Sequence, residues 1–261
     1  MARALRILVA GGWYYVVARG NNRAALFRDD RDRQRFLALA AELPERFSVE
    51  VHAFVLMDNH YHLVARTREA NLSHAFRWLH VSYSRWFNWR HRRVGHLFQG
   101  RFQAVVIQEE RGVCEVARYV HLNPARLKGL GLGKAEVRRQ RTAAASAPGA
   151  ALVAERLAVL REYPWSSWRV YAGAEARPLW LATQVVGAGS GGRTRAEQRA
   201  ALQAYTEGPL RAGHVESPWE RLVGGLVLGE AAYARGLLRG QAVNEREQTA
   251  ARRLRGREIG R

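Results

Sequence analysis

The fold is decided by the stretch Phe54-Val55-Leu56-Met57-Asp58-Asn59-His60-Tyr61-His62-Leu63-Val64. Six residues of mainly apolar, strand-like sequence lead into two histidines that are separated by one bulky residue. Alternate side chains of a β-strand share a face, so His60 and His62 should point to one side and Tyr61 to the other. Two neighbouring imidazoles on a rigid strand can bind one divalent metal ion. The alternative is a pair of polar residues on a half-buried strand.

The composition indicates a globular protein with a polyanionic partner. The chain has 261 residues, 48% of them hydrophobic, with eight Trp, nine Tyr and eight Phe, which is enough for a substantial core. Its 42 basic residues exceed its 23 acidic ones, the formal net charge is +19, and Lys128 and Lys134 are the only lysines. Arginine pairs bidentately with phosphate and stacks on bases. We therefore expect nucleic acid as the partner. An Arg-biased codon usage would explain why Arg replaces Lys, but not the excess of basic residues.

The cysteine content and the N-terminus indicate where the protein works. Cys114 is the only cysteine, which excludes a disulfide framework and a Cys-based zinc site. The apolar run near the N-terminus is short and is interrupted by Arg6, so we expect neither a spanning helix nor a secretion signal. These features suit the cytoplasm, and the basic charge suits association with the nucleoid.

Hydrophobic spacing predicts an alternation of strands and helices. Strands are expected at 13–18, 48–57, 61–65 and 97–107, and amphipathic helices at 30–43, 72–89 and 109–122. This order predicts an α+β fold, in which a mainly antiparallel sheet carries helices packed on one face.

The chain is expected to divide into two parts. Residues 143–150 form a low-complexity Ala-rich linker, so residues 1–142 should be one domain and residues 143–261 an accessory region. The accessory region is basic and should be mainly helical, with one helix around 220–238. Its Arg-rich tail, 242–261, is either a basic helix or a disordered arm.

A second group of candidate residues lies on the third predicted helix. Tyr119 and Asn123 are four residues apart and should share a helix face. A Tyr near a metal ion can act as a nucleophile, and the Asn carbonyl oxygen can be a third ligand. Mg²⁺ and Mn²⁺ accept such mixed oxygen and imidazole sites. Taken alone, Tyr119 is also explained as a packing residue, and Asn123 as the residue before Pro124 at a helix end.

Five stretches of the sequence resemble one family. His60-Tyr61-His62 resembles the histidine–hydrophobe–histidine (HUH) motif of single-strand DNA transposases, and residues 119–126 resemble their catalytic-tyrosine helix. Residues 15–23, 95–102 and 163–168 are similar to the REP-associated tyrosine transposase branch of this insertion-sequence-200-like family. The resemblance covers roughly residues 10–180. Two positions depart from the pattern: Tyr15 stands where a His is expected, and Tyr61 is larger than the usual aliphatic residue.

The resemblance implies a ferredoxin-like or RRM-like HUH core and a metal-dependent strand transferase. His60, His62 and Asn123 would hold one Mg²⁺ or Mn²⁺ ion, which would polarise a scissile phosphodiester of single-stranded DNA. Tyr119 would attack the phosphorus, which would give a 5′-phosphotyrosine link and a free 3′-hydroxyl. Attack by another 3′-hydroxyl would rejoin strands without ATP.

The resemblance also implies that the substrates are DNA hairpins with single-stranded flanks. Basic residues would contact the phosphates, and an exposed aromatic such as Trp89 could stack on a base. The arginines expected to bind DNA are Arg19, Arg23, Arg92, Arg93 and Arg101. Arg101 follows Gly100 in a turn, where the backbone can approach a phosphate closely.

Other functions remain open at this point. A related nickase would cleave without useful rejoining, as a relaxase or replication initiator does. A domesticated hairpin-binding protein would keep the DNA affinity without catalysis. A metal hydrolase acting on a small substrate would not explain the excess of basic residues. The sequence permits a monomer or a homodimer, and in a homodimer the tyrosine helix can be exchanged between subunits.

Overall fold

The computed structural model describes residues 6–108, 110–127, 130–132, 148–213, 215 and 217–240. The strands are β1 (Trp13–Arg19), β2 (Val49–Met57), β3 (His60–Thr67), β4 (Gln103–Ile107), β5 (Leu222–Val223) and β6 (Val227–Leu228). The helices of the first half are η1 (Asn21–Arg23), α1 (Asp30–Ala40), α2 (Leu43–Phe47), α3 (Leu72–Arg90), α4 (Glu110–His121) and α5 (Asn123–Leu127). Those of the second half are α7 (Ala150–Glu162), α8 (Trp168–Tyr171), α9 (Gln184–Ala188), α10 (Arg195–Ala212) and η2 (Pro218–Arg221), and residues 231–240 are also helical.

The strands form one mixed sheet. Over the described residues it has six strands in the order β2-β3-β1-β4-β6-β5. Strand β1 is antiparallel to both β3 and β4, β2 is antiparallel to β3, and only β6 runs parallel to its neighbour β4. The turn at Asp58 and Asn59 joins β2 to β3, and the register places Arg19 of β1 opposite His60 of β3. The predicted α+β class with a mainly antiparallel sheet is confirmed.

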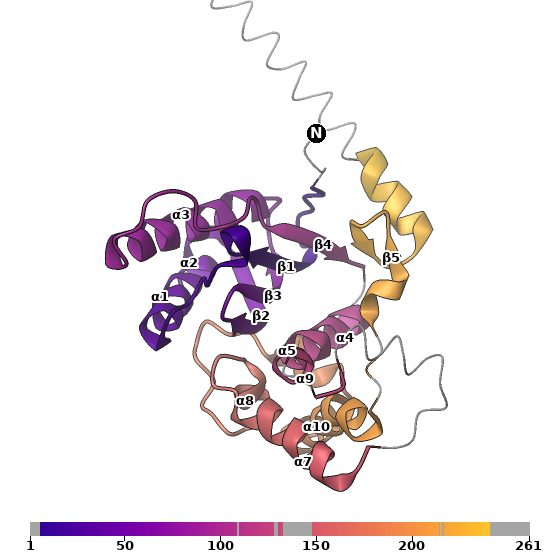
Figure 1. The fold of residues 1–261 in the computed structure, drawn as a ribbon. Coiled ribbons are helices and arrows are strands. Elements are labelled where there is room, and N and C mark those ends of the chain that lie inside the picture. Colours follow the sequence, from indigo (N-terminus) through magenta and orange to yellow (C-terminus); the bar gives the residue numbers. More distant parts are fainter. Residues whose placement is uncertain are drawn as a thin grey trace, which may run out of the picture.

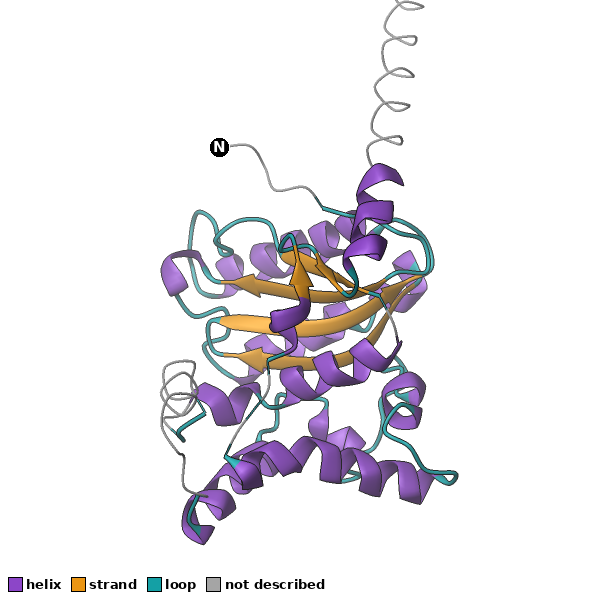
Figure 2. Ribbon diagram, turned by 90° about the vertical axis from the view of Figure 1, so that its right-hand side faces the viewer, coloured by secondary structure: helices purple, strands orange, loops and turns teal. Residues whose placement is uncertain are grey.

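Helices cover both faces of the sheet (Figures 1 and 2). On β1, Tyr14 and Val16 face the layer of α1 and α3, whereas Trp13 and Tyr15 face the layer of α4 and the later helices. The expectation that helices cover only one face is therefore wrong. The physical reason is visible in β1 itself, because both sets of alternate side chains are apolar or aromatic and each set needs a covering layer.

Helix α3 supplies most of the cover on the first face. Phe76, Leu79, Tyr83 and Phe87 recur at intervals of three or four residues, and all four are fully buried. The Tyr83 hydroxyl donates to the carbonyl of Leu26 at 2.6 Å, so its buried polar atom is satisfied. Burial of each such side chain contributes about 1.5–3 kcal/mol, which fixes the helix on the sheet.

The stretch 163–168 joins the second layer to the edge of the sheet. The amide of Leu56 donates to the carbonyl of Trp165, and the amide of Ser167 donates to the carbonyl of Phe54. The Ser167 hydroxyl also lies 2.9 Å from Nε2 of His121, the last residue of α4. This motif therefore holds the C-terminal end of α4 against β2.

The C-terminal region contributes to the same sheet. Helices were expected around 220–238, but η2 and the β5–β6 hairpin come first, and the helix begins only at residue 231. Gly224 and Gly225 both have positive φ and make the hairpin turn, which a continuous helix does not allow. The predicted division at residue 142 stays a prediction, and the Arg-rich tail lies outside the described residues.

No helix in the described part of the chain is long and apolar enough to cross a membrane.

Candidate active site

The two histidines lie side by side on β3. Their ring centroids are 4.9 Å apart, and both side chains point toward the α4 layer, as the two-residue period of a strand predicts. Tyr61, between them, is fully buried in the opposite layer, where its hydroxyl lies 2.6 Å from Nε2 of His80. The large residue at position 61 is therefore accommodated by the α3 layer and does not displace the histidines.

Both histidines are held in the neutral form. Burial lowers the pKa of His60 to about 4, and the positive charge of Arg19 acts in the same direction. Burial also places the pKa of His62 well below its usual value, with further contributions from His60, Arg126 and Arg19. A neutral imidazole has one nitrogen lone pair available, and this is the form that binds a metal ion.

Tyr15 makes a direct contact with the second histidine. Its hydroxyl lies 2.5 Å from Nδ1 of His62, and the two rings are stacked with centroids 5.6 Å apart. Nε2 of His62 is buried and has no hydrogen-bond partner among the described residues. Burial keeps the pKa of Tyr15 well above 10, so this phenol stays protonated. Tyr15, which stands where the resemblance implied a His, therefore places a protonated phenol beside His62.

The C-terminal half of α4 brings Tyr119 to the same place. The ring centroid of Tyr119 lies 6.3 Å from that of His62 and 6.2 Å from that of Tyr15. The helix is oriented by its buried side, which includes Val116 and Val120. The sequence predicted both the helix and the histidine strand, and the fold brings them together.

Two further residues surround Tyr119, and neither was among the predicted site residues. The guanidinium carbon of Arg126 lies 4.7 Å from the centroid of the Tyr119 ring, and the buried Nη1 of Arg126 has no described hydrogen-bond partner. The indole of Trp219 lies 5.1 Å from Tyr119 and 4.5 Å from Tyr15. Arg126 is the last residue of the tyrosine motif, residues 119–126, and could have been predicted from it. Nothing in the sequence links Trp219, 100 residues after Tyr119, to this site.

Asn123 opens the short helix α5, directly behind the tyrosine. Its Nδ2 donates to the carbonyls of Tyr119 and Val120 at 2.8 and 3.3 Å. No described hydrogen bond reaches its Oδ1, and none joins it to either histidine. Among the described residues, no group of three or more His, Cys, Asp or Glu side chains is placed to hold a metal ion. The predicted metal site at the two histidines and the third-ligand role of Asn123 both stay predictions.

A cleft opens from these residues along β1 and β4. Its volume is about 660 Å³, and its lining includes His62, Tyr119, Trp219 and the two arginines Arg19 and Arg101. A second hollow of about 340 Å³ shares both arginines. The structure thus brings two of the predicted DNA-binding arginines to the edge of the site.

The remaining predicted arginines lie outside the cleft. Arg23 ends η1, and its carbonyl accepts a hydrogen bond from Nδ2 of Asn59, beside the histidine strand. Arg92 and Arg93 lie in the loop after α3 and line neither hollow.

Comparison with known proteins finds a matching family and a similar solved structure. Residues 9–123 match the family described as IS200-like transposases, and this segment contains both histidines and Tyr119. A solved structure of a REP-associated tyrosine transposase bound to a REP hairpin is similar to 74% of this chain and 99% of that chain, with 16% identity and a TM-score of 0.47. No curated protein matches the sequence. The segment 9–123 of this chain is therefore similar to the IS200-like transposase family.

Proposed function

We propose that this protein is a transposase that cleaves and rejoins single-stranded DNA through a covalent bond to Tyr119, with a divalent metal ion held by His60 and His62. The observation that carries the proposal is the convergence of three side chains from two distant elements. The imidazoles of β3 and the phenol of α4 meet at one place, where the His62 and Tyr119 ring centroids are 6.3 Å apart.

The donor set fits Mg²⁺ or Mn²⁺. His62 has a buried, unpartnered Nε2, and both histidines are neutral, so two nitrogen lone pairs are available on one face. The Asn123 carbonyl oxygen is the proposed third ligand, and phosphate oxygens of the DNA would complete an oxygen-rich set. When bound, the ion would act as a Lewis acid on the scissile phosphate.

The residues of the chain have separate roles in the proposed step. The Tyr119 oxygen forms a bond to phosphorus and releases its proton to solvent, while the bond from phosphorus to the 3′-oxygen breaks and that oxygen takes up a proton. The Arg126 cation, 4.7 Å from the Tyr119 ring, favours the negative charge that develops on the phenol oxygen. The product is a 5′-phosphotyrosine, and attack by a second 3′-hydroxyl reverses the bond changes.

The cleft accounts for how a single strand would reach Tyr119. Arg19 and Arg101 lie on its lining and would bind backbone phosphates on either side of the scissile bond. Arg23 would extend this contact along the edge of the sheet toward hairpin DNA. The cytoplasmic, nucleoid-associated location predicted from the sequence follows from the same substrate.

The test is a denaturant-resistant protein–DNA adduct. The protein is mixed with Mn²⁺ and a single-stranded hairpin DNA from the flanks of its own gene, labelled at the 3′ end because the downstream fragment would stay attached. We expect an adduct with the wild type and with the control Tyr205→Phe, whose half-exposed ring lies on α10. Tyr119→Phe should form none and should keep its affinity for the hairpin.

Three outcomes would change the proposal. Adduct formation or cleavage by Tyr119→Phe would contradict the assignment of the nucleophile. Tight, salt-sensitive binding without any adduct would indicate the non-catalytic hairpin binder. An adduct that never transfers to an added 3′-hydroxyl would indicate the relaxase-like nickase.

A further inference from the structure

The last turn of α3 and the loop that follows it expose large apolar side chains. We call residues 89–96 the α3 tip; it lies at the left end of the molecule in Figure 1. Trp89 is 76% exposed and Val94 is 93% exposed, although both are surrounded in sequence by basic residues. A Trp that stays in water at a projecting tip contributes little to the core, so its exposure points to a partner.

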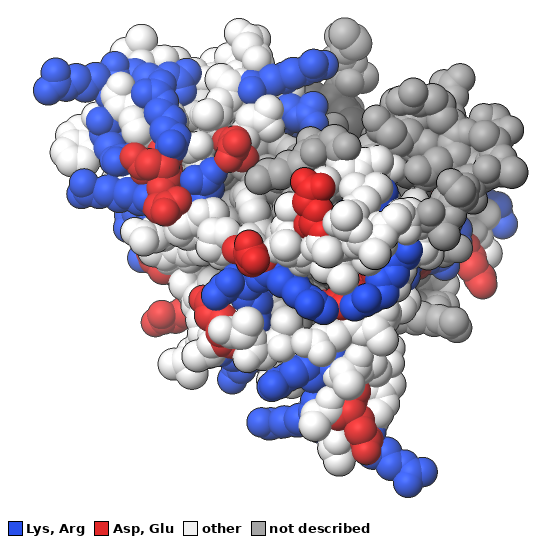
Figure 3. Space-filling model, turned by 60° about the horizontal axis from the view of Figure 1, so that its bottom comes forward, with Lys and Arg blue, Asp and Glu red and all other residues white. Residues whose placement is uncertain are grey.

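The charge around the α3 tip is uniformly positive in sequence. Residues 70–108 contain six Arg and no Asp or Glu. In the described part of the chain, Arg85, Arg92 and Arg93 form no ion pair, so their charges are not neutralised within the molecule. Basic side chains project at the left edge of the space-filling view in Figure 3, with a smaller group of acidic side chains beside them. A polyanion suits this surface better than a neutral or basic protein.

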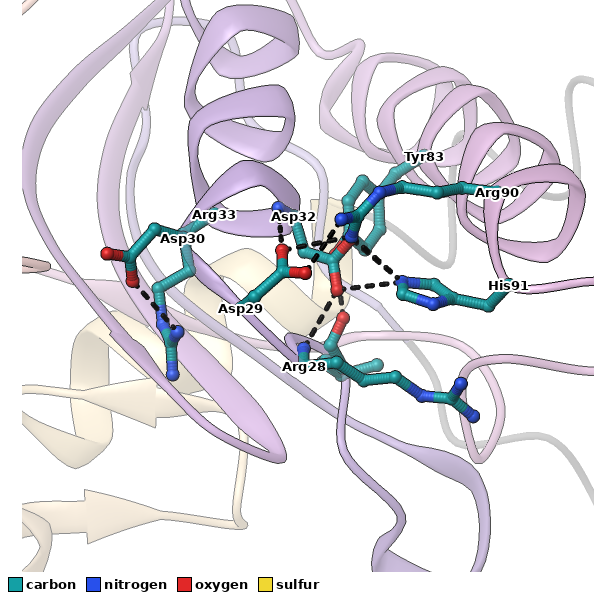
Figure 4. A network of polar contacts seen from close by, with 9 residues as sticks. Arg28, Asp29, Asp30, Asp32, Arg33, Tyr83, Arg90 and His91 are labelled. Carbon is teal, nitrogen blue, oxygen red and sulfur yellow. Dashed lines mark hydrogen bonds and ion pairs between the residues drawn. The ribbon is translucent and has the colours of Figure 1, made fainter.

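A polar network holds the base of the tip rigidly against α1 (Figure 4). Arg90 pairs with Asp29 at 2.7 Å and with the fully buried Asp32 at 2.5 Å, and His91 lies 2.9 Å from the same Asp32 carboxylate. Arg90 is thereby occupied in the fold. Among the basic side chains of the tip, Arg92 and Arg93 are the ones available to a ligand.

The tip itself has a fixed shape. The Arg93 amide donates to the carbonyl of Asn88 at 2.8 Å, and Nδ2 of Asn88 donates to the carbonyl of Gly95 at 3.0 Å. Arg92 has a φ of 49°, which is uncommon for a residue with a side chain and here lets the chain reverse. A rigid tip presents Trp89 and Val94 at a low entropic cost to binding.

The tip is connected to the edge of the sheet that carries the candidate active site. The Asn21 amide donates to the carbonyl of Leu97, and the Gln99 amide donates to the carbonyl of Arg19. The chain therefore runs from the tip directly along the end of β1 to Arg101 in the cleft. A DNA molecule that lies in the cleft and continues along this edge would reach the tip.

From these observations we infer that the α3 tip binds the unpaired loop of hairpin DNA. Trp89 stacks on an unpaired base, Val94 contacts the neighbouring sugar or base, and Arg92 and Arg93 bind phosphates of the loop. The loop is the appropriate part of the hairpin, because a base within a duplex has no free face on which an indole can stack. The inference rests on the proposed function for the identity of the DNA.

The test compares binding to three labelled DNAs: the hairpin, the same stem annealed from two strands without a loop, and an unstructured strand. Trp89→Ala should weaken binding to the hairpin by roughly 5- to 150-fold, the range for loss of one stacked base, and should leave the loop-free stem unaffected. Trp89→Phe should retain most of the affinity. Leu179→Ala removes a side chain of similar exposure, 94%, elsewhere on the surface and should change nothing.

The arginines are tested by the salt dependence of hairpin binding. The double variant Arg92→Gln, Arg93→Gln should make the log–log salt slope shallower by about 1.4, since each phosphate contact to a single strand contributes about 0.7. The matched control is Arg193→Gln, Arg195→Gln, at exposed positions around the start of α10. An unchanged slope in the first variant would overturn the assignment of these two arginines.

Other outcomes are equally decisive. If Trp89→Ala binds the hairpin like the wild type, or weakens the loop-free stem to the same extent, the inference is wrong. If it instead shifts a dimer to a monomer in sedimentation without DNA, the tip is a contact between copies of the chain. Adduct formation on the unstructured strand should be unaffected in Trp89→Ala, so failure of this inference is distinguishable from failure of the proposed chemistry.

Discussion

Replacing Tyr15 by Phe should weaken metal binding at His60 and His62. The substitution removes only the hydroxyl that lies 2.5 Å from Nδ1 of His62, within a buried pair of stacked rings. When Nδ1 carries the proton and donates to Tyr15, Nε2 offers its lone pair; in the other tautomer Nε2 carries hydrogen and cannot bind a metal. Loss of such a supporting hydrogen bond typically lowers metal affinity by about 10- to 100-fold, or about 1.4–2.7 kcal/mol.

The assay is calorimetric titration of the DNA-free protein with Mn²⁺, together with nitrogen NMR of labelled histidine. We expect the wild type to hold His62 protonated at Nδ1 and Tyr15→Phe to lose that preference. Tyr14→Phe is the matched control, because Tyr14 lies next in sequence but on the opposite face, where its hydroxyl accepts from the Val9 amide at 2.6 Å. Tyr15→His, which restores the residue expected from the family pattern, should recover Mn²⁺ affinity.

Two results would refute this reasoning. The first is an Mn²⁺ affinity of Tyr15→Phe equal to that of the wild type, with His62 still protonated at Nδ1. The second is an equal loss in Tyr14→Phe, which would trace the effect to general stability and not to the position of His62. A wild type that binds no Mn²⁺ would instead contradict the proposed metal site itself.

Three more predictions follow from the structure. Arg126→Gln should slow adduct formation by about 100-fold while hairpin affinity in a filter-binding assay changes little, because the cation lies beside the ring of Tyr119; equal rates would remove Arg126 from the mechanism. Gly20→Ala should lower the free energy of unfolding by about 1–3 kcal/mol in urea, since its Cβ would collide with a backbone carbonyl; an unchanged value would show that the turn relaxes freely. Burial lowers the pKa of His52 to about 4 and of His121 to about 3. Between pH 6.5 and 4 the unfolded chain therefore binds more protons than the folded one, and the free energy of unfolding decreases as the pH is lowered. Each of the two histidines should lower the free energy of unfolding by about 1.3 kcal/mol when the pH is lowered from 7.5 to 5.5. A urea midpoint that does not change with pH would contradict the burial of both imidazoles in the neutral form.

The local part of the site could be predicted from the sequence because it depends on short periods. The two-residue period of a strand places His60 and His62 on one face, and the helical period predicts the helix that carries Tyr119. Both arrangements are present in the structure. The predicted helix 109–122 ends at His121, and the chain then restarts as α5 at Asn123, since Pro124 is well tolerated in the first turn of a helix.

The long-range part of the site could not be predicted. Trp219 reaches Tyr119 only because η2 and the β5–β6 hairpin extend the sheet beyond β4, and two-residue strands such as β5 have no readable period. The role of Tyr15 depends on the register between β1 and β3, which pairs strands far apart in the chain. Apolar residues at successive positions of β1 require cover on both faces of the sheet, whereas the order of the elements predicted cover on one face.

Locating the covalent bond in the protein–DNA adduct is the most direct test of the proposed mechanism. The adduct formed with Mn²⁺ is digested with trypsin and nuclease, and the phosphorylated residue is identified by mass spectrometry. The structure offers two phenols at this place, with ring centroids 6.2 Å apart, and we predict that the phosphate is on Tyr119 alone. A phosphate on Tyr15 or on any other residue would contradict the proposed mechanism.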